Sequence, residues 1–297
     1  MTSTDNSTPD TDPGPVELHA RNVAFDVEKA PLHWIPGHPY ASNLITALNL
    51  ILPEGERWFV QTYNEALPLV RDEALANTMR GFIGQEAMHA AAHDKVIWDY
   101  VEAHGIDPLP YHRQMEWVFR KLLAPKTDGT AEQQRKHLIE RLWLIAAIEH
   151  YTAVLGDFAL NSSWREAGGD PTITDLFMWH GAEEVEHRCV AHEVAVYFGD
   201  SYLRRARVML LVMPSLLLIV FRGGRYISAN DPAGSTSFLQ RRREYRRGVR
   251  ANVLPRISGV IRYSLTYFRP GFDPTEVGDT AQAVAYLASS PAARNAS

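Results

Sequence analysis

Apolar residues recur every three or four positions along most of the chain, which is the spacing of helices with one buried face. The first such stretch runs from residue 44 to about 67, although Pro53 and Gly55 must interrupt it. Further helices are predicted over 71–103, 111–123, 131–160 and 171–198, while strand patterns are nearly absent before residue 200. The pattern therefore predicts an all-α fold built on four long helices, which is typical of a bundle.

The flanking segments differ from this helical region. Residues 1–16 are polar and rich in Pro, Ser, Thr and Asp, which predicts a disordered tail. Residues 17–200 are predicted to form the bundle, with irregular structure over 20–43, and residues 201–297 to form a C-terminal extension packed on the bundle or on a membrane. The single cysteine, Cys189, excludes a disulfide framework and a cysteine-based zinc site, and favours a reducing, cytoplasmic setting.

The extension begins with the most apolar stretch of the chain, residues 208–221 (VMLLVMPSLLLIVF). Its 14 residues are fewer than the roughly 20 needed to span a bilayer. Three interpretations remain open, namely a helix buried in the core or in a dimer interface, a helix lying on a membrane, and a transmembrane helix.

Charge is distributed unevenly between the extension and the rest of the chain. Residues 204–269 contain 14 arginines, no lysine and two acidic residues, so this segment carries a charge of +12. Because the net charge of the chain is −5, the remaining residues carry −17. This split favours an anionic surface, such as a membrane, as a partner of the extension. A solvated basic face, or a contact with the acidic part of the same chain, explains it equally well. No nucleic-acid partner is expected.

Two Glu-x-x-His motifs lie in separate predicted helices. Glu86 and His89 are three residues apart, so they are separated by only about 60° on one helix face. One such motif arises often by chance, but Glu184 and His187 repeat it in the helix over 171–198. The repetition is therefore the stronger signal for a metal site.

Each motif also has a glutamate upstream. Glu56 precedes Glu86 by 30 residues, and Glu149 precedes Glu184 by 35. In an antiparallel helix pair joined by a turn, these separations bring both residues to the same height. Any one of these glutamates alone would more often be a solvated surface residue, but Glu149 lies in an apolar run where an unpaired carboxylate is costly. Four glutamates neutralise two divalent cations, so we expect metal ligands at Glu56, Glu86, His89, Glu149, Glu184 and His187.

This repeated pattern resembles the ferritin-like di-iron carboxylate superfamily over residues 44–200. The resemblance implies a ferritin-like four-helix bundle with additional C-terminal helices, and two iron ions, or Mn and Fe, as cofactors. His180 lies on the same helix face as Glu184 and His187, a placement similar to that in p-aminobenzoate N-oxygenase, which implies that His180 is a further ligand. A hydrogen-bond donor behind the ligands, or a core histidine, remains open for His180.

Other polar residues near the motifs are predicted to support the ligands or to face solvent. His93 lies one turn beyond His89 and is expected behind it, while Asp94 and Asp157 could accept hydrogen bonds from ligand imidazoles. Glu186 points away from Glu184 on its helix and is expected to be solvated.

Four short runs together resemble a bacterial family described as predicted metal-dependent hydrolases. They are PEGERWFV (53–60), GQEAMH (84–89), EHYTA (149–153) and EEVEH (183–187). The resemblance extends from about residue 20 to the end of the fourth long helix and implies metal-dependent hydrolysis.

Three functions remain open from the sequence. The first is an O₂-dependent oxidase or oxygenase that acts on an apolar or aromatic small molecule and draws on an electron donor. The second is a hydrolase that uses a metal-bridging hydroxide, with Zn as an alternative metal. The third is metal storage or a membrane-associated partner protein. No catalytic side chain is predicted beyond the ligands, and a homodimer and peripheral attachment to a membrane both remain open.

Overall fold

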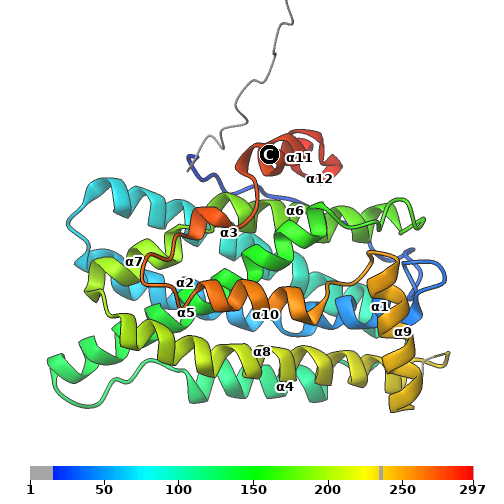
Figure 1. The fold of residues 1–297 in the computed structure, drawn as a ribbon, viewed down its shortest axis with the longest axis horizontal. Helices are drawn as coiled ribbons and strands as arrows, with labels where there is room; N and C mark the ends of the chain where they lie inside the picture. The colour runs from blue at the N-terminus through cyan, green and yellow to red at the C-terminus, as the bar shows by residue number, and fades with distance from the viewer. Residues whose placement is uncertain (1–15, 234–236, 297) are drawn as a thin grey trace, which may run out of the picture.

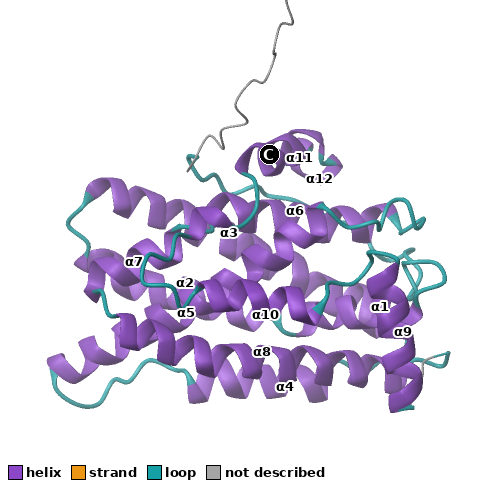
Figure 2. Cartoon of the chain, viewed as in Figure 1, coloured by secondary structure: helices purple, strands orange, loops and turns teal. Residues whose placement is uncertain are grey.

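The computed structural model describes residues 16–233 and 237–296, so the predicted tail over 1–16 lies outside the described residues except for Val16. All the regular elements within these ranges are helices (Figure 2). The predicted all-α fold is thus confirmed.

Four helices form the centre of the molecule, namely α2 (Leu52–Ala66), α3 (Glu73–Val96), α5 (Ala131–Leu160) and α6 (Pro171–His187). Helix α2 packs along α3, and α5 packs along α6 (Figure 1). Their starts follow from local sequence. The Asp72 side chain accepts from the Leu75 N–H, Thr130 and Gln133 form a capping box, and Asp170 caps α6 ahead of Pro171.

The structure divides two of the predicted helices. The stretch over 44–67 becomes α1 (Pro39–Thr46), a 3₁₀ turn at Ala47–Leu50 and α2. Pro53 lies in the first turn of α2, where its missing N–H costs no hydrogen bond. The helix predicted over 171–198 ends at His187 and resumes as α7 (Val190–Gly199).

Two other helices end in π-helical turns. Helix α3 continues as Ile97–Glu102, and α4 (Leu109–Trp117) continues as Val118–Leu122. Gly105 has a φ of +76°, a left-handed conformation that suits glycine and ends the first of these segments.

The C-terminal extension surrounds the four central helices. Helix α8 (Tyr202–Asn230) runs through Pro214 and packs on α1 and α5. It is followed by α9 (Phe238–Arg250), α10 (Ile257–Thr266), a 3₁₀ turn (Pro274–Glu276), α11 (Thr280–Ser289) and α12 (Pro291–Arg294). Figure 1 shows α8 and α4 along the lower edge of the molecule and α11 with α12 above α6. The central helices are therefore covered on two sides.

Helices α5 and α6 approach each other closely where two glycines meet. A Cβ atom placed on Gly156 would lie 2.4 Å from the Gly181 carbonyl oxygen, and one on Gly181 would lie 2.9 Å from the Gly156 Cα. Neither backbone can move away without separating the helices that carry Glu149 and Glu184. The close approach therefore depends on the absence of both side chains.

Replacing Gly156 with alanine is expected to lower the free energy of unfolding by about 1–3 kcal/mol, because the added methyl group overpacks the helix contact. Urea unfolding measures the change. Gly259→Ala in α10 is the matched control, since its Cβ would meet only the Arg256 Cβ at 4.0 Å. That control is expected to be neutral or slightly stabilising. Equal stabilities of the two variants would contradict the proposed crowding.

Candidate metal centre

All seven residues predicted as ligands meet between the four central helices, and each is at most 7% exposed. They come from α2 (Glu56), α3 (Glu86, His89), α5 (Glu149) and α6 (His180, Glu184, His187). Their donor atoms fall into overlapping groups in which every atom lies within 4.8 Å of the others. The structure thus brings together the whole set.

One group contains Glu86, Glu149, Glu184 and His187. The His187 Nε2 atom lies 3.1 Å from Glu149 Oε2, 3.2 Å from Glu184 Oε2 and 3.4 Å from Glu86 Oε1. Three carboxylates and one imidazole therefore face a common point.

A second group contains Glu56, Glu86 and His89. The His89 Nδ1 atom lies 3.7 Å from Glu86 Oε1 and 3.6 Å from Glu184 Oε1. Glu86 and Glu184 thus border both groups, which is the arrangement that two cations sharing bridging carboxylates require.

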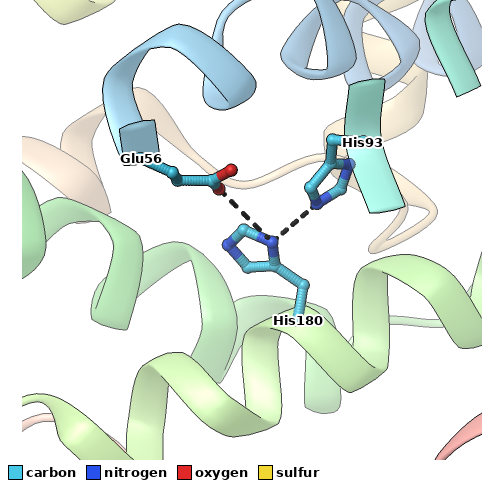
Figure 3. A group of neighbouring side chains, drawn as sticks. All are labelled: Glu56, His93 and His180. Carbon is cyan, nitrogen blue, oxygen red and sulfur yellow. Dashed lines mark hydrogen bonds and ion pairs between the residues drawn. The ribbon is translucent and has the colours of Figure 1, made fainter. Parts of the chain in front are cut away.

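His180 extends the second group toward His93. Its Nε2 atom lies 2.9 Å from Glu184 Oε1, and its Nδ1 atom lies 2.6 Å from His93 Nε2 and 3.8 Å from Glu56 Oε1 (Figure 3). His93 itself lies behind His180, as seen from Glu184. The structure therefore places His180 among the predicted ligands and His93 beside His180 rather than behind His89, in a group with Glu56 that could itself hold a metal ion.

Hydrogen bonds assign the tautomers of these imidazoles. The Asn49 amide donates to the Thr46 carbonyl, so its oxygen faces His93 Nδ1, 2.7 Å away, and accepts from it. His93 Nε2 is then an acceptor and receives a hydrogen bond from His180 Nδ1. His180 Nε2 faces Glu184, so it donates to this carboxylate when it carries a proton and offers its lone pair to a cation when it does not.

The other two imidazoles are held in the same way. His89 Nε2 donates to Glu183 Oε2 over 3.0 Å, which leaves the Nδ1 lone pair facing the glutamates. His187 Nδ1 donates to the Gln85 amide oxygen over 3.1 Å, because the Gln85 amide nitrogen donates to Glu186. All three imidazoles therefore direct one nitrogen at the carboxylates, and a fixed partner holds the other.

The acceptors behind the imidazoles differ from the predicted ones. Asp94 is instead paired with Arg57 at 3.0 Å, and Asp157 accepts from Asn161. Asn49, Gln85 and Glu183 take the places expected for these aspartates. The expectation for Glu186 was wrong, because this residue is 6% exposed and pairs with Arg21. The N-terminal segment that carries Arg21 covers this side of α6.

Several buried polar atoms in the centre have no hydrogen-bond partner among the described residues. They are both carboxylate oxygens of Glu56, both of Glu86 and Nδ1 of His89. A buried polar atom without a partner is destabilising by several kcal/mol. These atoms converge and carry the donor chemistry that divalent metals accept, so the residues fit a dinuclear metal site.

The pKa shifts of the four glutamates also support a metal site. Burial raises the pKa of Glu56 and Glu86 well above the usual range, and the negative charges of Glu149 and Glu184 raise it further. Burial and Glu184 raise the pKa of Glu149 to about 7. Burial opposes ionisation of Glu184 as well, but His187 and His180 outweigh it and hold the pKa of Glu184 well below its usual range. Only one of four carboxylates is thus charge-balanced by the protein alone.

Replacing Glu183 with glutamine is expected to weaken metal binding by roughly 10–100-fold, because His89 loses the anionic acceptor that orients it. Glu183 is fully buried and is itself held by Arg21 at 2.6 Å and by Trp179 at 3.1 Å. Competition with a metal chelator measures the affinity, and Glu132→Gln, which alters an exposed carboxylate on α5, is the control. Unchanged affinity would mean that packing on Trp179 alone orients His89.

A cavity of about 150 Å³ ends on the centre, with Glu56, Glu86 and Glu184 in its wall. Its other walls are almost wholly apolar and include Leu48 and Leu52 on one side and Leu216, Val220 and Phe221 of α8 on another. A second cavity of about 130 Å³ reaches His180 and shares Leu48, Leu52 and Val220 with the first. The carboxylates therefore border an apolar space between the bundle and α8, of the kind that binds apolar small molecules.

A family model described as "Predicted metal-dependent hydrolase" matches residues 19–278 of the chain. This range contains every residue of the candidate centre and all helices from α1 to α10. No curated protein and no solved structure matches the chain.

Proposed function

We propose that this chain, which belongs to the family of predicted metal-dependent hydrolases, is an enzyme that hydrolyses an apolar substrate at two buried metal ions. One observation carries the proposal. An apolar cavity ends on the unpartnered oxygens of Glu56 and Glu86, in a group of residues that fits two divalent cations. The family description supports hydrolysis as the reaction.

The residues divide naturally between two ions. Glu149 and His187 would hold one, Glu56, His89 and His180 the other, and Glu86 and Glu184 would contact both. When bound, such cations lower the pKa of a water molecule and polarise the bond to be cleaved.

The protein's own groups supply the remaining requirements of hydrolysis. The apolar walls bind the substrate and exclude bulk water, which strengthens every electrostatic interaction at the centre. Glu56 borders the cavity, has no hydrogen-bond partner and would contact one ion only, so its second oxygen is the group placed to take a proton from the attacking water.

O₂-dependent oxidation is a second candidate, and a specific observation favours it. All four carboxylates are glutamates on helices, and two belong to Glu-x-x-His motifs, which is the ligand set of di-iron and di-manganese carboxylate proteins. Under this proposal the ions are iron, or Mn and Fe, and an electron donor is needed. The same apolar walls would then bind an apolar or aromatic substrate.

Metal analysis followed by two assays separates these functions. We expect two ions per chain in protein purified without oxygen. Protein loaded with Zn, Mn or Fe is then tested on p-nitrophenyl esters of increasing acyl length, and ferrous protein is tested for O₂ uptake. Hydrolysis that increases with acyl length supports the main proposal. O₂ uptake without ester turnover by any metal form would replace it with the second, and absence of bound metal would refute both.

A further inference from the structure

Helix α8 exposes an apolar stripe on the outside of the molecule. Between its two ends, the exposed positions of α8 follow helical spacing along one face, and are Leu203, Arg207, Leu210, Leu211, Pro214, Leu218, Arg222 and Arg225. Leu210, Leu211 and Leu218 are each about 60% exposed, at 61%, 59% and 61%. The outer face of α8 thus has an apolar middle and arginines toward its ends.

Helix α4 lies beside α8 and exposes apolar side chains of its own. Tyr111 donates to the Ile219 carbonyl oxygen, and Tyr226 donates to the Asp107 carbonyl oxygen, so α4 runs beside the second half of α8. In the same segment Trp117 is 58% exposed, and Leu122, in the π-helical turn that follows, is 62% exposed. Several large apolar side chains exposed on neighbouring segments are unusual for a surface that faces only water.

The other face of α8 is fixed to the protein. Gly223 and Gly224 leave no room for side chains against Ala47, Tyr111 and Leu44. Among the described residues α8 is the one helix whose length and composition would allow it to cross a membrane, and 22% of its most apolar 18-residue window is buried. Because one side is packed on α1 and α5, the helix can lie in a membrane surface but cannot be surrounded by lipid.

A group of exposed arginines lies at the C-terminal end of this stripe. Figure 1 places α9 at this end of α8, and Tyr245 of α9 contacts Phe221 of α8 with ring centroids 5.8 Å apart. We call the group the arginine cluster. Its members are Arg222, Arg225, Arg242, Arg243, Arg246 and Arg250, all exposed, and none forms an ion pair with a carboxylate in the described part of the chain.

Too few acidic residues lie in the same segment to balance the cluster. Asp231 is buried and accepts from His33 and Asn43, so Glu244 is the one carboxylate of this segment that faces the six arginines. A second copy seated on this face would bring the same excess of positive charge. Anionic lipid headgroups would instead neutralise the cluster while the apolar stripe enters the interface.

We propose that the α8 stripe and the arginine cluster attach the protein to the surface of a membrane that contains anionic lipids. Helix α8 lies in the plane of the interface, with Leu210, Leu211 and Leu218 directed into it. The arginines bind the headgroups beside it.

This attachment has a consequence for the substrate, which rests on the proposed function. The inner face of α8 contributes Leu216, Val220 and Phe221 to the cavity that ends on the metal centre. The helix that contacts lipid therefore also walls the substrate site. An apolar substrate dissolved in the membrane would have a short path to the carboxylates.

Sedimentation with vesicles tests the attachment without measuring any reaction, so its result is independent of the proposed function. Full-length, metal-loaded protein is mixed with phosphatidylcholine vesicles that contain or lack phosphatidylserine. We expect binding to the anionic vesicles only, and weaker binding as salt is raised. The combined variant Arg242→Gln, Arg243→Gln, Arg246→Gln is expected to lose roughly fivefold in vesicle affinity for each arginine removed.

A matched control removes three exposed cations from α3 and the residues just before it, a region that does not pack on α8. This variant, Arg71→Gln, Arg80→Gln, Lys95→Gln, should bind like the unaltered protein. Leu210→Ser with Leu211→Ser should weaken binding without changing metal content. Equal sedimentation with neutral and anionic vesicles, or equal losses in the two triple variants, would overturn the proposal. The proposal would also be overturned if the two leucine substitutions converted a dimer to a monomer and left vesicle binding unchanged.

Discussion

Replacing Glu86 with alanine is expected to remove both metal ions, and with them nearly all activity. Glu86 borders both groups of donor atoms, and neither of its oxygens has another partner. Glu149 belongs to only one group, so Glu149→Ala should retain the ion held by Glu56 and His89. Elemental analysis after gel filtration measures the number of ions per chain.

We do not expect unfolding to cause the loss of metal in Glu86→Ala. In the metal-free protein, burial and the neighbouring glutamates raise the pKa of Glu86, which means that its ionised form is disfavoured there. Removing it should therefore leave the metal-free fold intact or stabilise it. Glu73→Ala, at an exposed position of the same helix, is the control and should keep both ions. Two ions per chain in Glu86→Ala would remove Glu86 from the proposed ligands.

The arrangement of the candidate ligands followed from the sequence because helix geometry determines it. The rise per residue sets the height of each side chain, so separations of 30 and 35 residues across a turn bring glutamates on paired helices together. The three-residue spacing of Glu-x-x-His fixes the shared face. The structure reproduces this convergence for all seven residues, while their role as metal ligands stays a prediction.

The residues behind the imidazoles could not be predicted in the same way. Glu183 faces His89 from another helix, and Arg21 reaches Glu186 across 165 positions of the chain. Such contacts depend on the rotation of each helix and on the path of the N-terminal segment, which carries no periodic signal. A clue for Glu183 was its position four residues after Trp179, whose indole donates to it.

The extent of α8 was also underestimated from the sequence. The apolar run over 208–221 is 14 residues long, whereas the helix has 29 because the arginines on both sides remain helical. Hydropathy identifies the apolar middle of such a helix but not its ends, because arginine is polar and yet a good helix former. Of the interpretations of this run, burial in the core of one chain is wrong, because its outer leucines are exposed, while burial in a dimer interface stays a prediction.

The metal-free protein is expected to become less stable as the pH rises, and Glu149 is the group for which the change can be estimated. Its pKa lies at about 7 in the folded protein, against an ordinary value of 4.5. Between these values the folded state holds a proton that the unfolded state has released. The contribution to stability is thus complete below pH 4.5 and is lost as the pH rises through about 7.

The size of this loss is on the order of 3 kcal/mol, since one pH unit corresponds to about 1.4 kcal/mol. His187 acts in the same direction at higher pH, because Glu184 and Glu149 outweigh its burial and raise its pKa well above 6.5. The depressed pKa of Glu184 affects stability only in acid, as the pH falls below its usual range. Bound cations would neutralise the carboxylates, so the metal-loaded protein should not show the loss.

Urea unfolding of chelator-treated and metal-loaded protein, from about pH 5 to about pH 8, measures the difference between the two forms. We expect this difference to widen steadily with pH. The Glu149→Gln variant cannot ionise at this position, so the free energy of unfolding of its metal-free form should change less with pH. At about pH 8 this form should be more stable than the unaltered metal-free protein. The same substitution should weaken metal binding, since a neutral amide replaces a charged donor. A metal-free protein that is equally stable at both pH values would mean that its carboxylates are not confined together, and the case for a dinuclear centre would fail with it.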